Sequence, residues 1–177
     1  VILRLGSLYG KSFDSTRLNI MPNLFAKISS FNGKITLYSG GKQLKSLVSI
    51  NDVVRCMEFV GENKKINKEI FNCVNENLSV KDVADLCKKI NKKTDVVTTD
   101  DPIPNEGYTL TNKKIRSKGF KFLYNVEDSF REMISSWSDQ SQILSNEIIE
   151  SGADEFVDER GIISNYYVDD SINMIGY

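Results

Sequence analysis

The chain has 177 residues, 40% of them hydrophobic, which is enough for one domain with a substantial core. Its 23 basic and 24 acidic residues leave a net charge of −1, so charge gives no preference for nucleic acid or an anionic membrane. The sequence contains no histidine, which argues against a zinc enzyme and against a serine hydrolase with a histidine base.

In chain order, the sequence predicts alternating strands and helices. Residues 1–5 are expected as a buried parallel strand, and residues 6–10 as a glycine-bracketed loop at its carboxyl end. Residues 21–31 have apolar side chains at helical spacing. Further short strands are expected at residues 35–38, 47–50, 70–74 and 96–98.

Capping signals predict the remaining helices. Asn51 and Asp52 precede an apolar-periodic run and are expected to form an N-cap. Ser79 followed by Asp82 has the spacing of a capping box, with Asp where Glu is usual. The later helices are expected at residues 111–118 and 126–137, followed by a linking helix at 138–152.

The patterns divide the chain into residues 1–137, a linker at 138–152, and a β-rich segment at 153–177. Residues 158–165 and 172–175 alternate with turn signals, and they resemble the first strands of a cupin-type barrel. The alternative is a C-terminal extension without fixed structure. Both ends of the chain fall inside apolar patterns, so we expect it to be part of a longer protein.

The sequence shows no membrane-spanning run and no signal peptide. Its three cysteines lack CxxC spacing. We therefore expect reduced, mostly buried thiols in a cytoplasmic protein that binds neither membrane nor nucleic acid.

Several short motifs occur in an order that is typical of one enzyme family. They are RLGSLYG at 4–10, ITLYSGGKQ at 35–43, LVSINDV at 47–53, FNCV at 71–74 and KIRSKGF at 114–120. Together they resemble the extended short-chain dehydrogenases, the NAD-dependent epimerases and dehydratases of nucleotide sugars. The resemblance implies an α/β fold: the C-terminal half of a Rossmann-type enzyme, with the last sheet strands and a mixed α/β substrate-binding lobe, followed by a truncated β-rich segment.

The family's catalytic Tyr-x-x-x-Lys helix and GxxGxxG loop are not recognised here, so no catalytic residue and no metal ligand is expected. Tyr38 and Lys42 match the spacing, but the adjacent Gly40 and Gly41 disfavour the helix that such a pair needs. The resemblance implies that NAD or NADP is bound mainly by an N-terminal half. Leu5 and Gly6 would form a wall beside the nicotinamide.

Four residues are expected at the substrate by the same resemblance. Ser7 stands where many members carry Asn, and Lys45 where they commonly carry an Arg that grips the diphosphate. Tyr9 would line the sugar pocket, and Asn23 would approach the nucleobase. Simpler alternatives stay open: a turn serine for Ser7, a core aromatic for Tyr9 and a solvated lysine for Lys45.

The implied function is the substrate-binding portion of an NAD(P)-dependent epimerase or dehydratase that acts on a nucleotide-diphosphate sugar. The intact enzyme would work by hydride transfer through a keto-sugar, in polysaccharide or nucleotide-sugar biosynthesis, and a homodimer of it is allowed for. The chain alone is expected to be inactive. Two alternatives are a non-catalytic binding module of the same superfamily and a bifunctional fusion with a cupin sugar epimerase or isomerase.

Overall fold

The computed structural model describes residues 1–11, 17–103 and 106–151, and for 139–151 the backbone alone. The predicted cupin-like segment at 153–177 therefore lies outside the described residues. The elements in chain order are β1 (Ile2–Leu5), β2 (Ser7–Tyr9), α1 (Met21–Ser30), β3 (Lys34–Tyr38), the 3-10 turn η1 (Ser39–Gly41), β4 (Leu44–Ser49), α2 (Ile50–Glu62), β5 (Ile70–Cys73), β6 (Glu76–Ser79), α3 (Val80–Ile90), β7 (Asp95–Thr99), α4 (Lys113–Ser117) and α5 (Val126–Ser151).

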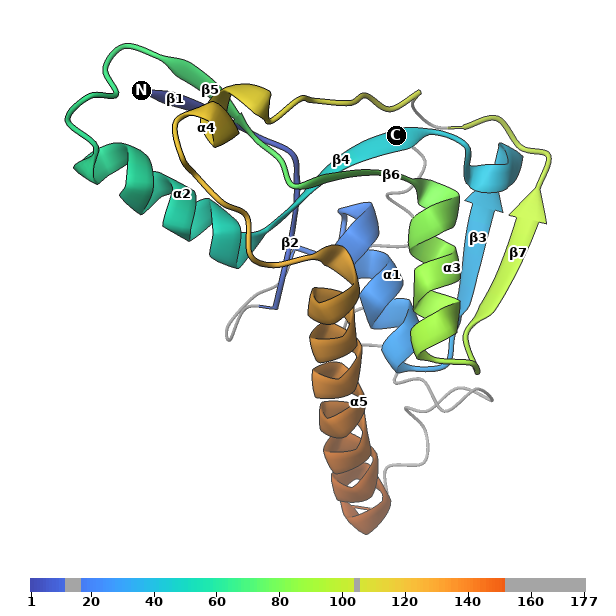
Figure 1. Ribbon diagram of the computed structural model, residues 1–177. Helices are drawn as coiled ribbons and strands as arrows, with labels where there is room; N and C mark the ends of the chain where they lie inside the picture. Colours follow the sequence, from blue (N-terminus) through green and yellow to red (C-terminus); the bar gives the residue numbers. More distant parts are fainter. Residues whose placement is uncertain (12–16, 104–105, 152–177) are drawn as a thin grey trace.

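The strands of the described part form three small sheets (Figure 1). Strand β1 pairs with β5 in parallel, β3 pairs with β7 in parallel, and β4 lies between a parallel β2 and an antiparallel β6. Every one of these pairs joins strands that are not consecutive in sequence. Parallel pairs of this kind need long crossover connections, which the intervening helices supply.

The β1–β5 sheet and the β2–β4–β6 sheet meet where two chain segments pass from the first sheet into the second. The first passes from β1 to β2 at Gly6, and the second from β5 to β6 at Val74 and Asn75. The Gly6 N–H donates to the Cys73 carbonyl at 3.2 Å, and the Asn75 N–H donates to the Leu47 carbonyl at 2.9 Å. We call this place, defined by Gly6, Val74 and Asn75, the sheet division.

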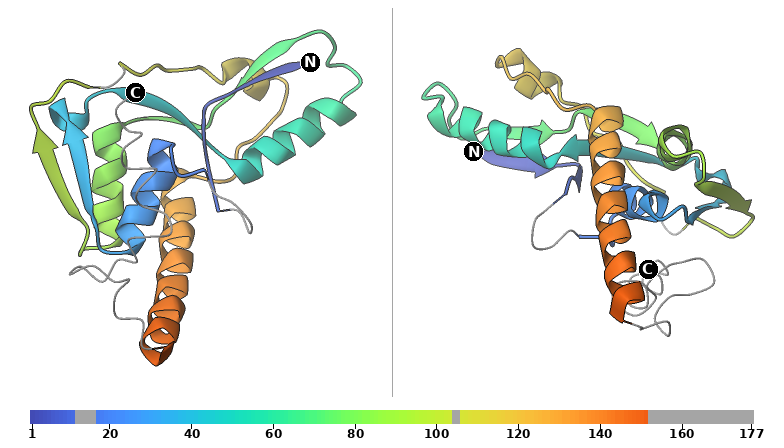
Figure 2. Two further views of the ribbon diagram at one scale, coloured as in Figure 1. Left: turned by 180° about the vertical axis from the view of Figure 1, so that it is seen from behind. Right: turned by 90° about the horizontal axis from the view of Figure 1, so that it is seen from below.

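The core has two parts, one on each side of the sheet division. Helices α1, α3 and α5 pack on one cluster that includes Phe25, Leu37 and Phe130. Helix α2 packs on β1 and β5 in a second cluster that includes Cys56 and Phe71. Figure 2 shows the same separation from behind, with α2 and the β1–β5 pair at one end and the β3–β7 pair at the other.

Most predicted elements are confirmed, and so is the mixed α/β fold class with parallel pairing. The capping box is present, because the Ser79 side chain accepts from the Asp82 N–H and the Asp82 carboxylate accepts from the Ser79 N–H. Gly40 and Gly41 have positive φ angles and lie in η1, so Tyr38 and Lys42 do not share a helix.

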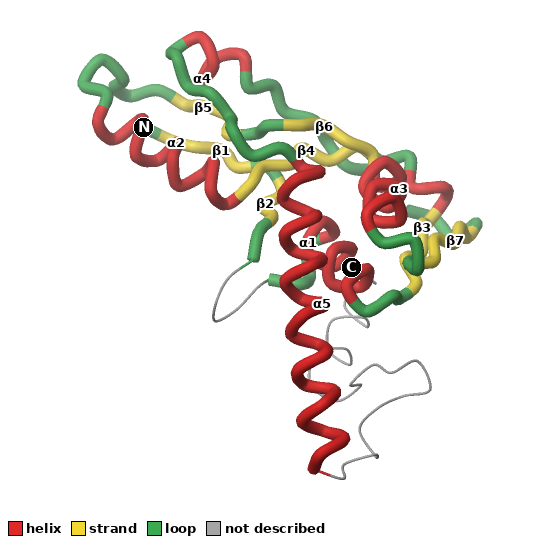
Figure 3. Tube along the Cα trace, turned by 60° about the horizontal axis from the view of Figure 1, so that its bottom comes forward, coloured by secondary structure: helices red, strands yellow, loops and turns green. Residues whose placement is uncertain are grey.

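Four local predictions were wrong. Strand β1 is not buried, because its residues are exposed or only partly buried. Residues 6–10 are not simply a loop, since β2 forms there by pairing with β4. No element was predicted where strand β6 forms. Helix α2 has Ser49 as its N-cap, and Asp52 lies inside its first turn. The predicted helices at 126–137 and 138–152 are one helix, α5, which extends beyond the rest of the described fold (Figure 3).

Candidate functional site

Three of the residues predicted at the substrate lie on one face of the β2–β4–β6 sheet. In the parallel β2–β4 pair, Ser7 is opposite Leu47 and Tyr9 is opposite Ser49. Paired residues point to the same face of a sheet, and residues two apart along a strand do so as well. Lys45 lies two positions before Leu47, so its side chain shares the face of Ser7 and Tyr9.

Lys45 and Ser7 lie close to the sheet division. Lys45 is partly buried, and this burial lowers the pKa of its ammonium group. An ammonium that has lost part of its hydration gains more from a nearby anion than a fully solvated one does. The partly buried hydroxyl of Ser7, on the neighbouring strand, can both donate and accept a hydrogen bond. Together these two groups suit an anionic, oxygen-rich ligand.

Tyr9 lies in the core and has 1% of its surface exposed. Its hydroxyl donates to the Tyr124 carbonyl at 3.3 Å, and its ring meets Phe130 edge-on with 5.8 Å between centroids. Burial raises the pKa of the Tyr9 hydroxyl well above its ordinary value. The hydroxyl therefore stays protonated and serves a contact inside the chain. A contact between Tyr9 and a sugar stays a prediction.

Asn23 is buried in helix α1, and both ends of its amide are used within the chain. Its Oδ1 accepts from the Gly10 N–H at 3.1 Å, and its Nδ2 donates to the Arg17 carbonyl at 3.0 Å. The side chain thus holds the chain just after β2 and just before α1. No sequence pattern indicated these contacts, because Gly10 lies 13 positions and Arg17 6 positions from Asn23. A contact between Asn23 and a nucleobase stays a prediction.

Leu5 and Gly6 lie at the carboxyl end of the parallel β1–β5 pair. In open parallel sheets, ligands bind beyond this end of the strands. A Cβ on Gly6 would lie 2.5 Å from the Ser46 carbonyl oxygen, so strand packing alone explains the glycine. The bare Gly6 backbone and the half-buried Leu5 fit the edge of a cofactor site. No glycine-rich strand-to-helix loop occurs in the described residues, so a pyrophosphate cradle is not assigned to them.

Sequence reasoning missed a buried carboxylate network that holds the segment before α5. Asp52 is fully buried, and it accepts hydrogen bonds from the Leu123 and Tyr124 N–H groups, each at 3.1 Å. Arg55 pairs with it at 2.6 Å. The one local signal was the Asp-x-x-Arg spacing on a helix, which by itself also fits a surface ion pair.

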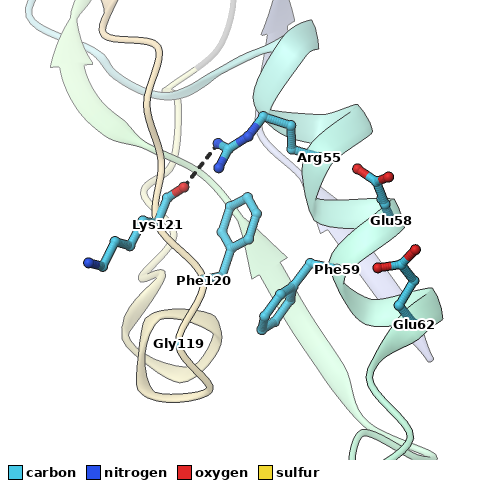
Figure 4. Close-up of a pocket in the computed structure, with 7 residues that line it drawn as sticks. All are labelled: Arg55, Glu58, Phe59, Glu62, Gly119, Phe120 and Lys121. Carbon is cyan, nitrogen blue, oxygen red and sulfur yellow. Dashed lines mark hydrogen bonds between the residues drawn. The ribbon is translucent and has the colours of Figure 1, made fainter.

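A hollow lies beside helix α2, and Arg55 forms part of its lining (Figure 4). It is lined by Arg55, Glu58, Phe59, Glu62, Gly119, Phe120 and Lys121. None of the residues predicted at the substrate or cofactor lines it. The hollow is therefore distinct from the candidate site at the sheet division.

The described residues offer neither a metal cluster nor a membrane span. In that part of the chain, His, Cys, Asp and Glu side chains nowhere gather in threes as a metal site would need. Among the described helices, none combines the length and the apolar character that crossing a membrane requires.

A family model and a curated relative both match the chain in sequence. Residues 1–73 match the model of the NAD dependent epimerase/dehydratase family. The dihydroflavonol 4-reductase of Callistephus chinensis is 29% identical over 119 residues, which are 65% of this chain and 32% of that protein.

Solved structures give the fold. The UDP-glucose 4-epimerase of Thermus thermophilus, in complex with NAD, matches with a TM-score of 0.64 at 19% identity, over 76% of this chain and 45% of that one. The UDP-glucuronic acid 4-epimerase of Bacillus cereus, in complex with UDP-glucuronic acid and NAD, matches with a TM-score of 0.63 at 21% identity, over 79% and 45%.

The solved structures show that the fold is that of part of a Rossmann-type enzyme. The family-model match over residues 1–73 confirms the predicted resemblance to the extended short-chain dehydrogenases of the NAD-dependent epimerase/dehydratase type. The chain spans about a third of the curated relative and just under half of these solved structures.

Proposed function

We propose that this chain is the substrate-binding portion of an NAD(P)-dependent epimerase or dehydratase that acts on a nucleotide-diphosphate sugar. The observation that supports this most is the placement of Ser7 and Lys45 on one sheet face, next to the carboxyl end of the β1–β5 pair. This arrangement occurs within the segment that matches the family model.

The chain's own residues would bind and orient the substrate. The Lys45 ammonium would contact the diphosphate, and the Ser7 hydroxyl would hydrogen-bond an adjacent oxygen. Tyr9 holds β2, and Asn23 holds Gly10 and Arg17, so these two side chains would fix the wall behind the sugar. Such remote contacts hold the reacting carbon in place, which is where binding energy contributes to rate.

The cofactor would lie against Leu5 and Gly6, with most of its contacts in an N-terminal half. A bound nicotinamide supplies a hydride acceptor, which suits oxidation of a sugar hydroxyl to a ketone. Further polypeptide is proposed to cover apolar side chains that are exposed here, among them Ile2 at 57% and Ile70 at 41%. Within the described residues, β1 pairs with β5 alone, so its other edge is available to a further strand.

The remaining features of the proposal follow from the resemblance. Residues 1–137 are proposed as one unit, residues 138–152 as a linker and residues 153–177 as the start of a cupin-like domain. The full-length protein is proposed to be a cytoplasmic enzyme of polysaccharide or nucleotide-sugar biosynthesis, with a homodimer allowed for, and the chain alone to be inactive. A non-catalytic binding module would instead bind the sugar nucleotide without turnover.

The test replaces one of two lysines on the same segment of the full-length gene product. Lys45→Met removes the partly buried charge, whereas Lys42→Met removes an exposed charge three residues earlier. Binding of UDP-glucose, measured by calorimetry, should weaken about ten- to hundredfold in Lys45→Met, because a hydrogen bond to a charged group is lost. Lys42→Met should bind like the wild type, and Lys45→Arg should bind at least as tightly. Equal affinities for the two methionine variants would contradict the proposed site.

A further inference from the structure

The Asp52 carboxylate fixes one short backbone segment. Leu123 N–H lies 3.1 Å from each carboxylate oxygen, and Tyr124 N–H lies 3.1 Å from Oδ2. A fully buried carboxylate is tolerated only when such donors and a counter-ion surround it. Arg55 is that counter-ion, at 2.6 Å.

Arg55 holds the same segment from its other side. Its Nη1 donates to the Lys121 carbonyl at 3.0 Å, as Figure 4 shows, and its guanidinium lies 5.4 Å from the centre of the Phe120 ring. The buried charge and its partner therefore hold neighbouring parts of one stretch, residues 120–124. Both side chains come from the first two turns of α2.

Tyr124, whose N–H group Asp52 fixes, also joins the two strands that leave the sheet division, β2 and β6, which we call its two arms. The Tyr124 carbonyl accepts from the Tyr9 hydroxyl at 3.3 Å and from Asn75 Nδ2 at 3.1 Å. Tyr9 is the last residue of the first arm, β2, and Asn75 directly precedes the second arm, β6. One residue, held by its N–H group, therefore holds both arms by its carbonyl.

We infer that Asp52 is a positioning residue for the candidate site, because it holds Tyr124, whose carbonyl links Tyr9 to Asn75. This inference rests on the proposed function, in which Ser7 on β2 contacts the substrate. A displacement of Tyr124 would let β2 shift against the β5–β6 turn. Ser7 would then move relative to Leu5 and Gly6, and small misplacements of this kind have large effects on catalysis.

The test compares Asp52→Asn with Val53→Ala in the full-length gene product. Asparagine keeps one acceptor oxygen but turns an NH2 donor toward other donors. Val53 is the adjacent core residue, with 2% exposure, so it serves as a control for lost stability. Asp52→Asn should raise the KM for UDP-glucose about five- to thirtyfold, the factor for one lost buried contact. Val53→Ala should keep the wild-type KM even if its melting temperature falls as far as that of Asp52→Asn.

A second variant and a second measurement complete the test. Tyr9→Phe keeps the ring and removes the hydrogen bond from the Tyr9 hydroxyl to the Tyr124 carbonyl. It should therefore raise the KM for UDP-glucose, as Asp52→Asn does. The double variant with Asp52→Asn should show less than the product of the two effects, since both act through Tyr124. Hydrogen exchange should speed up in the peptides that contain Ser7 and Asn75 in Asp52→Asn but not in Val53→Ala.

Each outcome decides one question. Equal KM values and equal exchange for Asp52→Asn and Val53→Ala would overturn the inference and leave Asp52 a structural residue. If the wild-type protein neither binds nor converts a nucleotide sugar, the proposed function fails. The exchange measurement still decides in that case whether Asp52 fixes the two arms. If Asp52→Asn does not fold, an unchanged KM in Tyr9→Phe overturns the inference.

Discussion

Replacing Gly6 with alanine would place a methyl group inside the sheet division. The added Cβ would lie 2.5 Å from the Ser46 carbonyl oxygen, 3.0 Å from its carbonyl carbon and 3.1 Å from Val74 Cγ2. Two of these atoms belong to the backbone of β4, which cannot turn aside as a flexible side chain can. The strands must therefore move apart locally, and overpacking of this kind costs about 1–3 kcal/mol. Reduced freedom of the unfolded chain returns about 0.4–1 kcal/mol, so a net loss of about 1.3 kcal/mol, and at most about 2.6 kcal/mol, is expected.

Urea denaturation of the full-length gene product measures this loss as a lower midpoint with an unchanged slope. Gly61→Ala is the matched control, because Gly61 lies in α2 and a Cβ there would meet no atom within 4 Å. Alanine is the better helix former by about 1 kcal/mol, so this variant should be as stable as the wild type or more stable. If Gly6→Ala were as stable as Gly61→Ala, the close approach of β4 to Gly6 would be refuted.

Two further predictions concern stability and reactivity. Ser79→Ala should lower the free energy of unfolding by about 1 kcal/mol in urea denaturation, since it removes an N-cap. Hydrogen bonds from Ser79 hold the pKa of Asp82 below its ordinary value of 3.8. The difference in unfolding free energy between Ser79→Ala and the wild type should therefore have its full size near neutral pH, and it should shrink as the pH falls from 3.8 through the lowered pKa. Cys56, Cys73 and Cys87 are buried, and desolvation raises the pKa of Cys87 to about 12. Because all three thiols are buried, Ellman's reagent should label them much more slowly in the native protein than in the urea-unfolded protein at the same pH, and equally rapid labelling would contradict their burial.

Much of the fold could be predicted because its signals are local. The capping box needs only Ser79 and Asp82, three positions apart, and helix α1 needs only the spacing of its apolar residues. Strand β1 was recognisable as a short apolar run. These features depend on neighbours in sequence, so they could be read without knowing what packs against them.

The parts that could not be predicted depend on distant partners. Strand β2 exists because Ser7–Tyr9 pairs with β4, and a three-residue segment between glycines carries no strand signal of its own. Asp52 resembled an N-cap because its real partners, the N–H groups of Leu123 and Tyr124, lie 71 and 72 positions away. Its neighbour Ser49 is the cap instead.

The site was predictable as a set of residues but not as a geometry. Family resemblance named Ser7 and Lys45, and only the β2–β4 register shows that they share a face. The same resemblance named Tyr9, whose hydroxyl the structure finds in a core contact with Tyr124. A motif identifies which positions matter, whereas register and burial determine what each side chain can reach.

The pairing of strands that are distant in sequence has a consequence for biosynthesis. Within the described residues, β1 cannot form its ladder before Ile70 is made, and β2 cannot form its own before Leu47. A ribosome adds residues one at a time, so the apolar first strand leaves the exit tunnel long before its partner has been made. Loop closure over such distances is slow, which exposes the nascent chain to wrong pairing. The order of the strands therefore leaves β1 without its β5 partner until residues 70–73 have been made.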